Sequence, residues 1–219
     1  AAFDVAAGKF IKLADETMRE LDVAAYGPWA VGIDRRAYLR DETVLPAGDY
    51  YRVNTATGER TLIAKGQLVG RHVFGIHPRG THFLYWKDGT IVAYDLAAGA
   101  AKTLGAGIVD FTNAEYDHPG NKPSYGVAGY ASDGKSVIIN HRYDLWLVPL
   151  DGSAPKNLTN GFGTASEIRF RLLRVVPPDP AQPRPEAARQ LFDLARPQTL
   201  SAYGEWTKKS GYFELANGK

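Results

Sequence analysis

The amino-acid sequence predicts an all-β fold made of repeated four-stranded units, and three observations support this. A glycine turn recurs along the chain, the segments beside each turn are rich in aromatic and β-branched residues, and turn-forming residues are frequent. The chain has 219 residues with 23 glycines and 11% aromatic residues. Aromatic residues favour strands and glycine favours tight turns, so this composition is typical of an all-β protein.

The recurring pattern is an alternating strand that ends in a small or acidic residue, then a glycine turn, then a second strand. Its glycines are Gly8, Gly58, Gly99, Gly152 and Gly218. They recur at intervals of roughly 40 to 65 residues, and a repeat of about 40–45 residues with insertions is typical of a four-stranded propeller blade. Helical repeats have similar periods, but the strand-like segments are short, β-branched and bounded by turn residues. We therefore predict a β-propeller segment of about four to five four-stranded blades, part of a larger propeller.

The predicted blades follow one another without a domain linker. We place a blade tail at 1–14 and blades at about 16–65, 66–106, 107–161 and 164–219. The clearest strands lie at 71–76, 81–86, 90–96 and 101–104, and in the next blade at 125–131, 136–140 and 145–150. One blade cannot bury both faces of its sheet, so neighbouring blades must stack on each other. Two insertions, 108–124 and 177–197, interrupt the repeat, and 185–192 is expected to form a short helix or a surface loop.

Composition argues against several classes of function. The formal net charge is +2, from 26 basic and 24 acidic residues, so no nucleic-acid partner is expected. The chain has no cysteine, which removes disulfides and thiolate chemistry from consideration. No apolar stretch approaches the roughly 18 residues of a membrane span, and the first residues lack the pattern of a signal peptide. We expect no cofactor.

The sequence contains no complete catalytic site. The Gly-x-Ser-x-Gly elbow of an α/β-hydrolase is absent, and the nearest serine between glycines, Ser132, lies in a predicted blade turn. None of the five histidines is four residues from another, so no helical metal-binding pair is present. We therefore predict neither catalytic residues nor metal ligands.

One rim of the predicted propeller carries the candidate binding residues. The connection between two blades lies on the same rim as the hairpin that joins the second and third strands of a blade. The insertion 108–124 and the hairpin 141–144 therefore bring together Glu115, Asp117, His118, Arg142 and Asp144. Loops on a rigid scaffold commonly carry binding functions. Carboxylates there would hold a peptide amino terminus and Arg142 a carboxylate, or these charges simply pair with each other.

Several stretches resemble a known family. Residues 77–96, beginning His-Pro-Arg-Gly, and residues 131–139, beginning Ala-Ser-Asp-Gly, resemble the blade repeat of prolyl-oligopeptidase-like and Tol-type propellers. Residues 115–119, 125–130 and 142–146 are similar to the propeller portion of bacterial serine peptidases of the prolyl oligopeptidase family, of the dipeptidyl or acylaminoacyl peptidase kind. In that family the serine, aspartate and histidine of the triad lie in a C-terminal α/β-hydrolase domain, and nothing in this sequence matches them.

The resemblance implies a non-catalytic propeller domain that caps the hydrolase domain of the same parent chain and gates the entry of peptide substrates. It also favours a periplasmic or secreted location. The alternative is a stand-alone binding propeller of the Tol type that mediates protein–protein interaction. A propeller glycosidase or lyase ranks last, because acidic residues do not converge on one channel in the sequence pattern.

Overall fold

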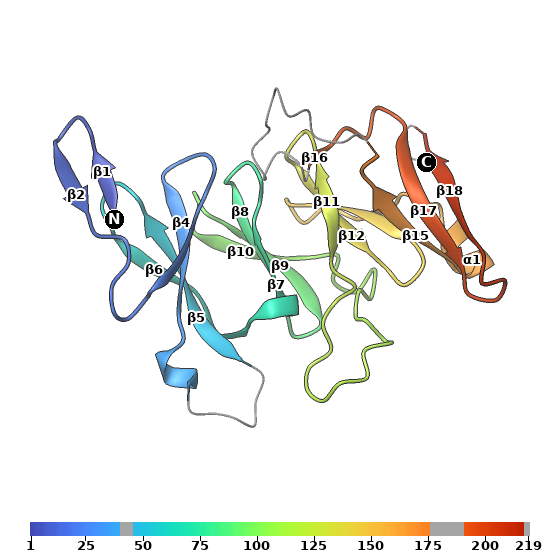
Figure 1. Cartoon of the computed structure of the whole chain (residues 1–219), viewed down its shortest axis with the longest axis horizontal. Helices are drawn as coiled ribbons and strands as arrows, with labels where there is room; N and C mark the ends of the chain where they lie inside the picture. The colour runs from blue at the N-terminus through green and yellow to red at the C-terminus, as the bar shows by residue number, and fades with distance from the viewer. Residues whose placement is uncertain (40–45, 176–190, 217–219) are drawn as a thin grey trace. The chain divides into compact units, whose positions relative to one another are not determined.

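Figure 1 shows the computed structural model of the chain, which describes residues 1–39, 46–175 and 191–216. Most of its regular structure is β-strand, and the strands form successive sheets with antiparallel pairing between sequence neighbours. The predicted all-β fold is therefore confirmed, and its series of meander sheets is that of a propeller segment. No helix among these residues is long and apolar enough to cross a membrane.

The N-terminal part of the chain forms a hairpin and a four-stranded meander. The hairpin pairs β1 (Ala2–Asp4) with β2 (Lys9–Ile11). The meander runs in the order β3 (Glu20–Val23), β4 (Trp29–Asp34), β5 (Ala47–Asn54) and β6 (Arg60–Leu68), with the 3-10 turn η1 (Arg36–Tyr38) after β4. Each strand pairs antiparallel with the one before it, as in a meander of consecutive strands.

A second four-stranded meander follows, after the 3-10 turn η2 (Gly70–His72). Its strands, in order, are β7 (Val73–Ile76), β8 (His82–Lys87), β9 (Thr90–Asp95) and β10 (Ala100–Leu104). The β8–β9 hairpin turns through Asp88 and Gly89, which both have positive φ. A two-residue turn of this kind matches the twist of the flanking strands.

The C-terminal part of the chain forms a five-stranded and a three-stranded sheet. The first has the order β14-β13-β12-β11-β16, and its strands are β11 (Val127–Ala131), β12 (Ser136–Asn140), β13 (Leu145–Pro149), β14 (Lys156–Asn157) and β16 (Leu191–Phe192). The second has the order β15 (Ile168–Leu173), β17 (Gln198–Gly204) and β18 (Ser210–Leu215), preceded by the helix α1 (Phe162–Ser166).

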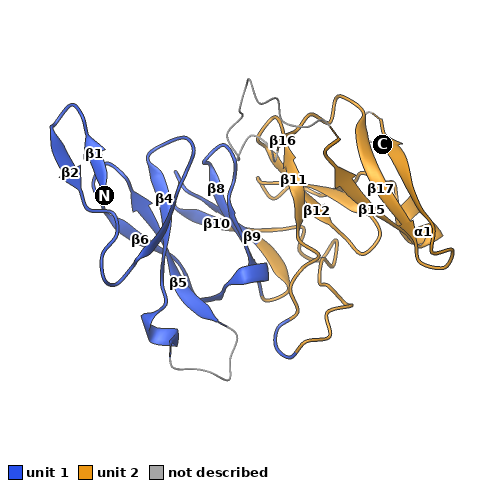
Figure 2. Ribbon diagram, viewed as in Figure 1, with its two compact units in different colours: residues 1–87, 92–101, 119–121 blue, residues 88–91, 102–118, 122–219 orange. Residues whose placement is uncertain are grey.

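The chain divides into two compact units, coloured separately in Figure 2. The first unit comprises residues 1–87, 92–101 and 119–121, and the second comprises 88–91, 102–118 and 122–219.

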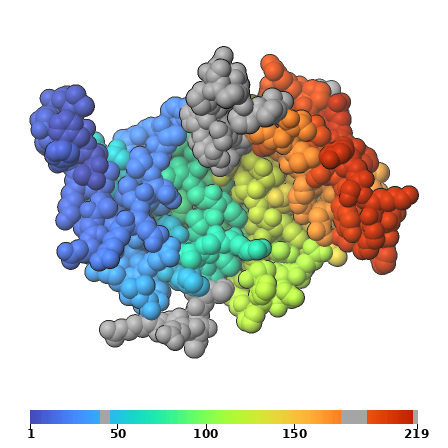
Figure 3. Space-filling model, viewed as in Figure 1, coloured from blue at the N-terminus to red at the C-terminus, as the bar shows by residue number. Residues whose placement is uncertain are grey.

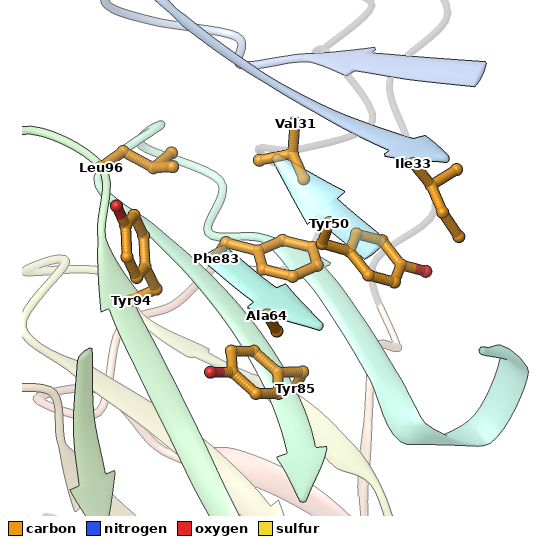
Figure 4. Close-up of a cluster of buried hydrophobic side chains, with 8 residues drawn as sticks. All are labelled: Val31, Ile33, Tyr50, Ala64, Phe83, Tyr85, Tyr94 and Leu96. Carbon is orange, nitrogen blue, oxygen red and sulfur yellow. The ribbon is translucent and has the colours of Figure 1, made fainter. Parts of the chain in front are cut away.

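In the first unit, two meanders pack face to face. The buried cluster drawn in Figure 4 combines residues of β4, β5 and β6 with residues of β8, β9 and the turn after β9. Its members are Val31, Ile33, Tyr50, Ala64, Phe83, Tyr85, Tyr94 and Leu96. The Tyr50 and Phe83 rings lie with their centroids 5.2 Å apart across this interface. The stacking of one sheet on the next buries the apolar faces, as expected of adjacent blades.

In the second unit, the five-stranded and three-stranded sheets pack in the same way. Ile138 and Leu145 of the first sheet meet Phe170, Leu200 and Leu215 of the second. Each of these side chains is at most 3% exposed. Fully burying an aliphatic or aromatic side chain of this size contributes about 1.5–3 kcal/mol, so this interface is the main source of stability for the last sheet.

The strand assignments of the sequence hold in the clearest repeat, but two features differ. Residues 185–192 were expected to form a short helix or loop; 185–190 lie outside the described residues, whereas Leu191 and Phe192 pair in parallel with Tyr130 and Ala131 of β11. The helix α1 was not predicted. It starts after its N-cap residue, Gly161, which has a left-handed φ of 75° and no side chain that could cap the helix.

Candidate binding site on the last sheet

The candidate site lies on the polar face of the three-stranded sheet. Residues alternate between the two faces of a strand, so Phe170 of β15 points into the core while Arg169 and Arg171 share the opposite face. The strand register places Arg169 opposite Tyr203 and Arg171 opposite Ser201 of β17. Two arginines therefore stand side by side over a sheet that is rigidly packed on its other face.

Arg169 pairs with two glutamates, Glu115 of the insertion that precedes β11 and Glu205 of the turn after β17. Glu115 lies 3.4 Å from Arg142 Nε and 3.4 Å from Arg169 Nη2. Glu205 lies 2.5 Å from the same Arg169 nitrogen. We call Glu115, Arg142, Arg169, Arg171 and Glu205 the arginine cluster. Its ion pairs are between about a fifth and a half exposed, so each contributes modestly to stability.

Arg171 is the member of the arginine cluster that pairs with no glutamate. Its guanidinium donates to two main-chain carbonyls, that of Phe170 at 2.6 Å and that of Arg142 at 3.4 Å. No carboxylate among the described residues forms an ion pair with it. Burial, and then the neighbouring charge of Arg169, lower the pKa of Arg171 to about 10. The Glu115 carboxylate acts in the opposite direction as a smaller effect, so the side chain stays charged at neutral pH without a direct ion pair.

Two further ionisable groups adjoin the cluster and carry no charge at neutral pH. Burial lowers the pKa of His141, which favours the neutral imidazole. Burial likewise raises the pKa of Tyr125, whose ring lies 6.2 Å from that of His141. The cluster therefore holds three guanidinium groups against two carboxylates, which leaves one net positive charge.

A hollow of about 290 Å³ opens over the two arginines of β15. Its walls are hydroxyl-bearing and aromatic: the lining comprises Arg169, Arg171, Ser201, Ala202, Tyr203, Ser210, Gly211 and Tyr212. Tyr212 is 77% exposed, so the hollow is open to solvent on the side of β18. The C-terminal strands, in red, also lie at the surface in Figure 3. A small polar group can therefore reach the arginines without a rearrangement of the sheet.

The structure joins only two of the five candidate residues expected to share a rim. Glu115 and Arg142 form an ion pair. Asp117 and His118 lie 3.8 Å apart on the exposed part of the insertion, with side chains 91% and 72% exposed, and the His118 ring stacks edge-on against Tyr116. Among the described residues, neither side chain forms an ion pair with a member of the arginine cluster.

The sequence predicts Asp144 as a binding residue of the rim, but in the structure its side chain is buried. Its side chain is 1% exposed. One carboxylate oxygen accepts from the Thr159 hydroxyl at 2.6 Å and the Gly163 amide at 3.0 Å. The other accepts from the amide and hydroxyl of Thr164, at 3.2 and 2.5 Å. The carboxylate thus caps the first turn of α1 and is fully used in holding the segment after β14.

Three members of the arginine cluster are not among the residues that the sequence predicts for the site: Arg169, Arg171 and Glu205. A signal was present for the arginines, because Ile168-Arg-Phe-Arg-Leu alternates apolar and basic residues with the period of a strand. It indicates two arginines on one face of a sheet. Their neighbours could not be read in the same way, because Glu115 and Glu205 are distant in sequence and meet Arg169 only in the folded sheet.

No group of three or more metal-ligating side chains was found in the ranges 1–39, 46–175 and 191–216.

Comparison with known proteins yields little for this chain. No protein-family model and no curated protein matches the sequence. Among solved structures, the crystal structure of the tricorn protease is similar with 12% sequence identity and a TM-score of 0.26. The match covers 96% of this chain but only 27% of the tricorn protease chain, so this chain spans about a quarter of that protein's length. Similarity at that level carries no argument, and the fold rests on the sheets described above.

Proposed function

We propose that this chain is a non-catalytic segment of propeller blades that binds peptides at the arginine cluster. In the parent protein it caps the α/β-hydrolase domain of a serine peptidase and restricts which peptides enter. The observation that carries the binding proposal is Arg171, which forms no ion pair among the described residues, beside an open hollow on a packed sheet. Sites of this kind, placed on a packed scaffold, are suited to holding an extended ligand.

The link to a peptidase rests on the sequence. Residues 77–96 and 131–139 resemble prolyl-oligopeptidase-like blades, and no Gly-x-Ser-x-Gly elbow occurs among the 219 residues. The hydrolysis is therefore assigned to a second domain of the parent chain. Capping and gating follow from that assignment as the role left for the blades.

The gene that encodes this chain tests the peptidase link. If the reading frame continues beyond Lys219 into a further segment of roughly 250 residues with a Gly-x-Ser-x-Gly elbow, the proposal stands. If it ends without such a segment, the chain is instead a stand-alone binding propeller.

A labelling experiment tests the non-catalytic assignment. We expect a fluorophosphonate probe, which reacts with activated serines, to leave the 219-residue chain unlabelled. Labelling of Ser132 or any other serine would place a catalytic site in the blades themselves and would contradict the proposal.

A further inference from the structure

The arginine cluster has a charge imbalance that is local to Arg171. Glu115 lies between Arg142 and Arg169, and Glu205 faces Arg169 alone. Both carboxylates are therefore already engaged with other guanidiniums. Within the described ranges, the hydrogen-bond acceptors of the Arg171 guanidinium are carbonyl oxygens. Carbonyls satisfy the N–H donors of a guanidinium but do not neutralise its charge, and a partly buried charge without a counter-ion is costly.

The hydrogen-bond donors and the charge around Arg171 suit a ligand group with one negative charge. The hollow places Ser201, directly across the strand pair, and Tyr203 and Tyr212 around the two arginines of β15. An arginine fork and nearby hydroxyls are the donors that bind a carboxylate in its plane. Because the cluster is short of a single negative charge, a ligand with one carboxylate balances it, whereas a dianion would leave it negative.

We propose that the hollow over β15 is a carboxylate site, in which Arg171, assisted by Arg169, binds one carboxylate group of a peptide ligand. This inference rests on the proposed function and names the group recognised there. The carboxylate is supplied either by the C-terminus of the peptide or by an acidic side chain. The two sources share the same chemistry, and peptide probes separate them.

The probes are four short peptides that differ only in their acidic group. Acetyl-tetraalanine is used with a free C-terminus and as the C-terminal amide, and acetyl-Ala-Glu-Ala-Ala-amide is compared with the corresponding glutamine peptide. Binding to the 219-residue chain is measured by calorimetry at low salt. We expect at least a tenfold preference for a carboxylate-bearing peptide over its amide partner, since one charge-assisted pair is lost in the amide. The pair that shows the preference identifies the source of the carboxylate.

Variants assign the preference to Arg171. Arg171→Met should remove it, and Arg171→Lys, which keeps the charge but loses the planar fork, should retain part of it. Arg196→Met is the matched control in the same unit, because Arg196 is 82% exposed and pairs with Asp193. A structural role for Arg171 would lower the melting temperature of Arg171→Met without ligand. We expect that temperature to stay the same or to rise, because the substitution removes an uncompensated charge.

The outcomes separate this inference from the proposed function. Equal binding of acidic and amide peptides, or full binding by Arg171→Met, overturns the carboxylate site and leaves peptide binding intact. If no peptide binds but acetate shifts the NMR signal of the Arg171 side chain, the carboxylate site stands and peptide binding is overturned. If neither peptides nor acetate bind, both are overturned.

Discussion

Two partly buried arginines, one in each unit, differ in the groups that contact their guanidinium. Arg60 of β6 in the first unit contacts the Asp15 carboxylate at 3.1 Å, the Thr17 hydroxyl at 3.1 Å and the Leu13 carbonyl at 3.1 Å. Arg171 of β15 in the second unit donates hydrogen bonds to two carbonyls and forms no ion pair with any carboxylate that the structure describes. Both side chains lie over a packed sheet.

The difference indicates what each arginine is for. Arg60 ties the segment before β3 to the last strand of the same sheet, so its contacts are complete within the unit. The Asp15 carboxylate, the partner of Arg60, is likewise bound by groups of the same unit. Hydrogen bonds from the hydroxyl and amide of Thr17, followed by that from Arg60, lower the pKa of the Asp15 carboxyl. A charge that is paired within its unit in this way has a structural role. We propose that the charge of Arg171, which forms no ion pair with a described carboxylate, is available to a ligand.

The largest effect on stability is expected at Asp144, the buried and fully hydrogen-bonded carboxylate of the second unit. Asp144→Ala leaves the buried amide of Gly163 and the donors of Thr164 without an acceptor, so it should lower the free energy of unfolding by about 3 kcal/mol. Urea denaturation measures this. Asp151→Ala, in an exposed turn where the carboxylate bonds to Ser153, is the control and should change stability little. If the two variants are equally stable, Asp144 is not the structural residue described here.

A smaller effect should separate Arg60 from Arg171. Arg60→Met removes a complete set of contacts and should lower the melting temperature by roughly 2–4 °C, the shift produced by about 1 kcal/mol in a chain of this size. Arg171→Met should leave it unchanged or raise it. Thermal unfolding followed by circular dichroism compares the two. A loss of stability in Arg171→Met as large as that in Arg60→Met would abolish the distinction between the units.

The pH dependence of stability gives a finer comparison. The Asp15 pKa is lowered in the folded chain, so its contribution is present above the ordinary value of 3.8 and is lost as the pH falls below it. The His141 pKa is lowered from 6.5 by burial, so the unfolded chain binds this proton more readily and stability decreases as the pH falls below about 6.5.

Variants at these two positions should each flatten one part of the stability profile. Asp15→Asn should flatten it near pH 4, and His141→Gln should flatten it between pH 7 and 5, as measured by urea denaturation across this range. His118→Gln, whose side chain is 72% exposed, is the histidine control. A profile that His118→Gln alters as much as His141→Gln would show that burial of His141 is not the cause.

The strands could be predicted from the sequence where their alternation is regular. Residues 136–140 were expected as a strand and form β12, and the turn at Asp88 and Gly89 follows from its residue types. The helix α1 was not predictable, because its cap comes from Asp144, at least 19 residues away in sequence from the amides it accepts from. The two-residue strand β16 is too short to carry a pattern of its own.

Of the arginine cluster, only the proximity of Glu115 and Arg142 could be predicted from the sequence. The pairing of Glu115 with Arg142 follows from blade geometry, which places an inter-blade connection beside the next hairpin. Arg169 and Arg171 carry a strand alternation that marks their shared face, but the absence of an acidic partner for Arg171 is a property of the folded sheet. Whether an arginine has a carboxylate partner depends on residues that are distant in sequence, and a single sequence does not reveal those contacts.

A carboxylate placed opposite Arg171 within the chain itself tests the account most directly. Ser201 is the cross-strand partner of Arg171, so Ser201→Asp supplies the missing negative charge, and Ser201→Asn is the neutral control of the same shape. We predict that Ser201→Asp has a higher melting temperature than Ser201→Asn, because an opposite charge across a strand pair is stabilising, and that it no longer prefers carboxylate-bearing peptides. A Ser201→Asp variant that is less stable than Ser201→Asn, or that keeps the preference, would contradict the claim that Arg171 is an open carboxylate site.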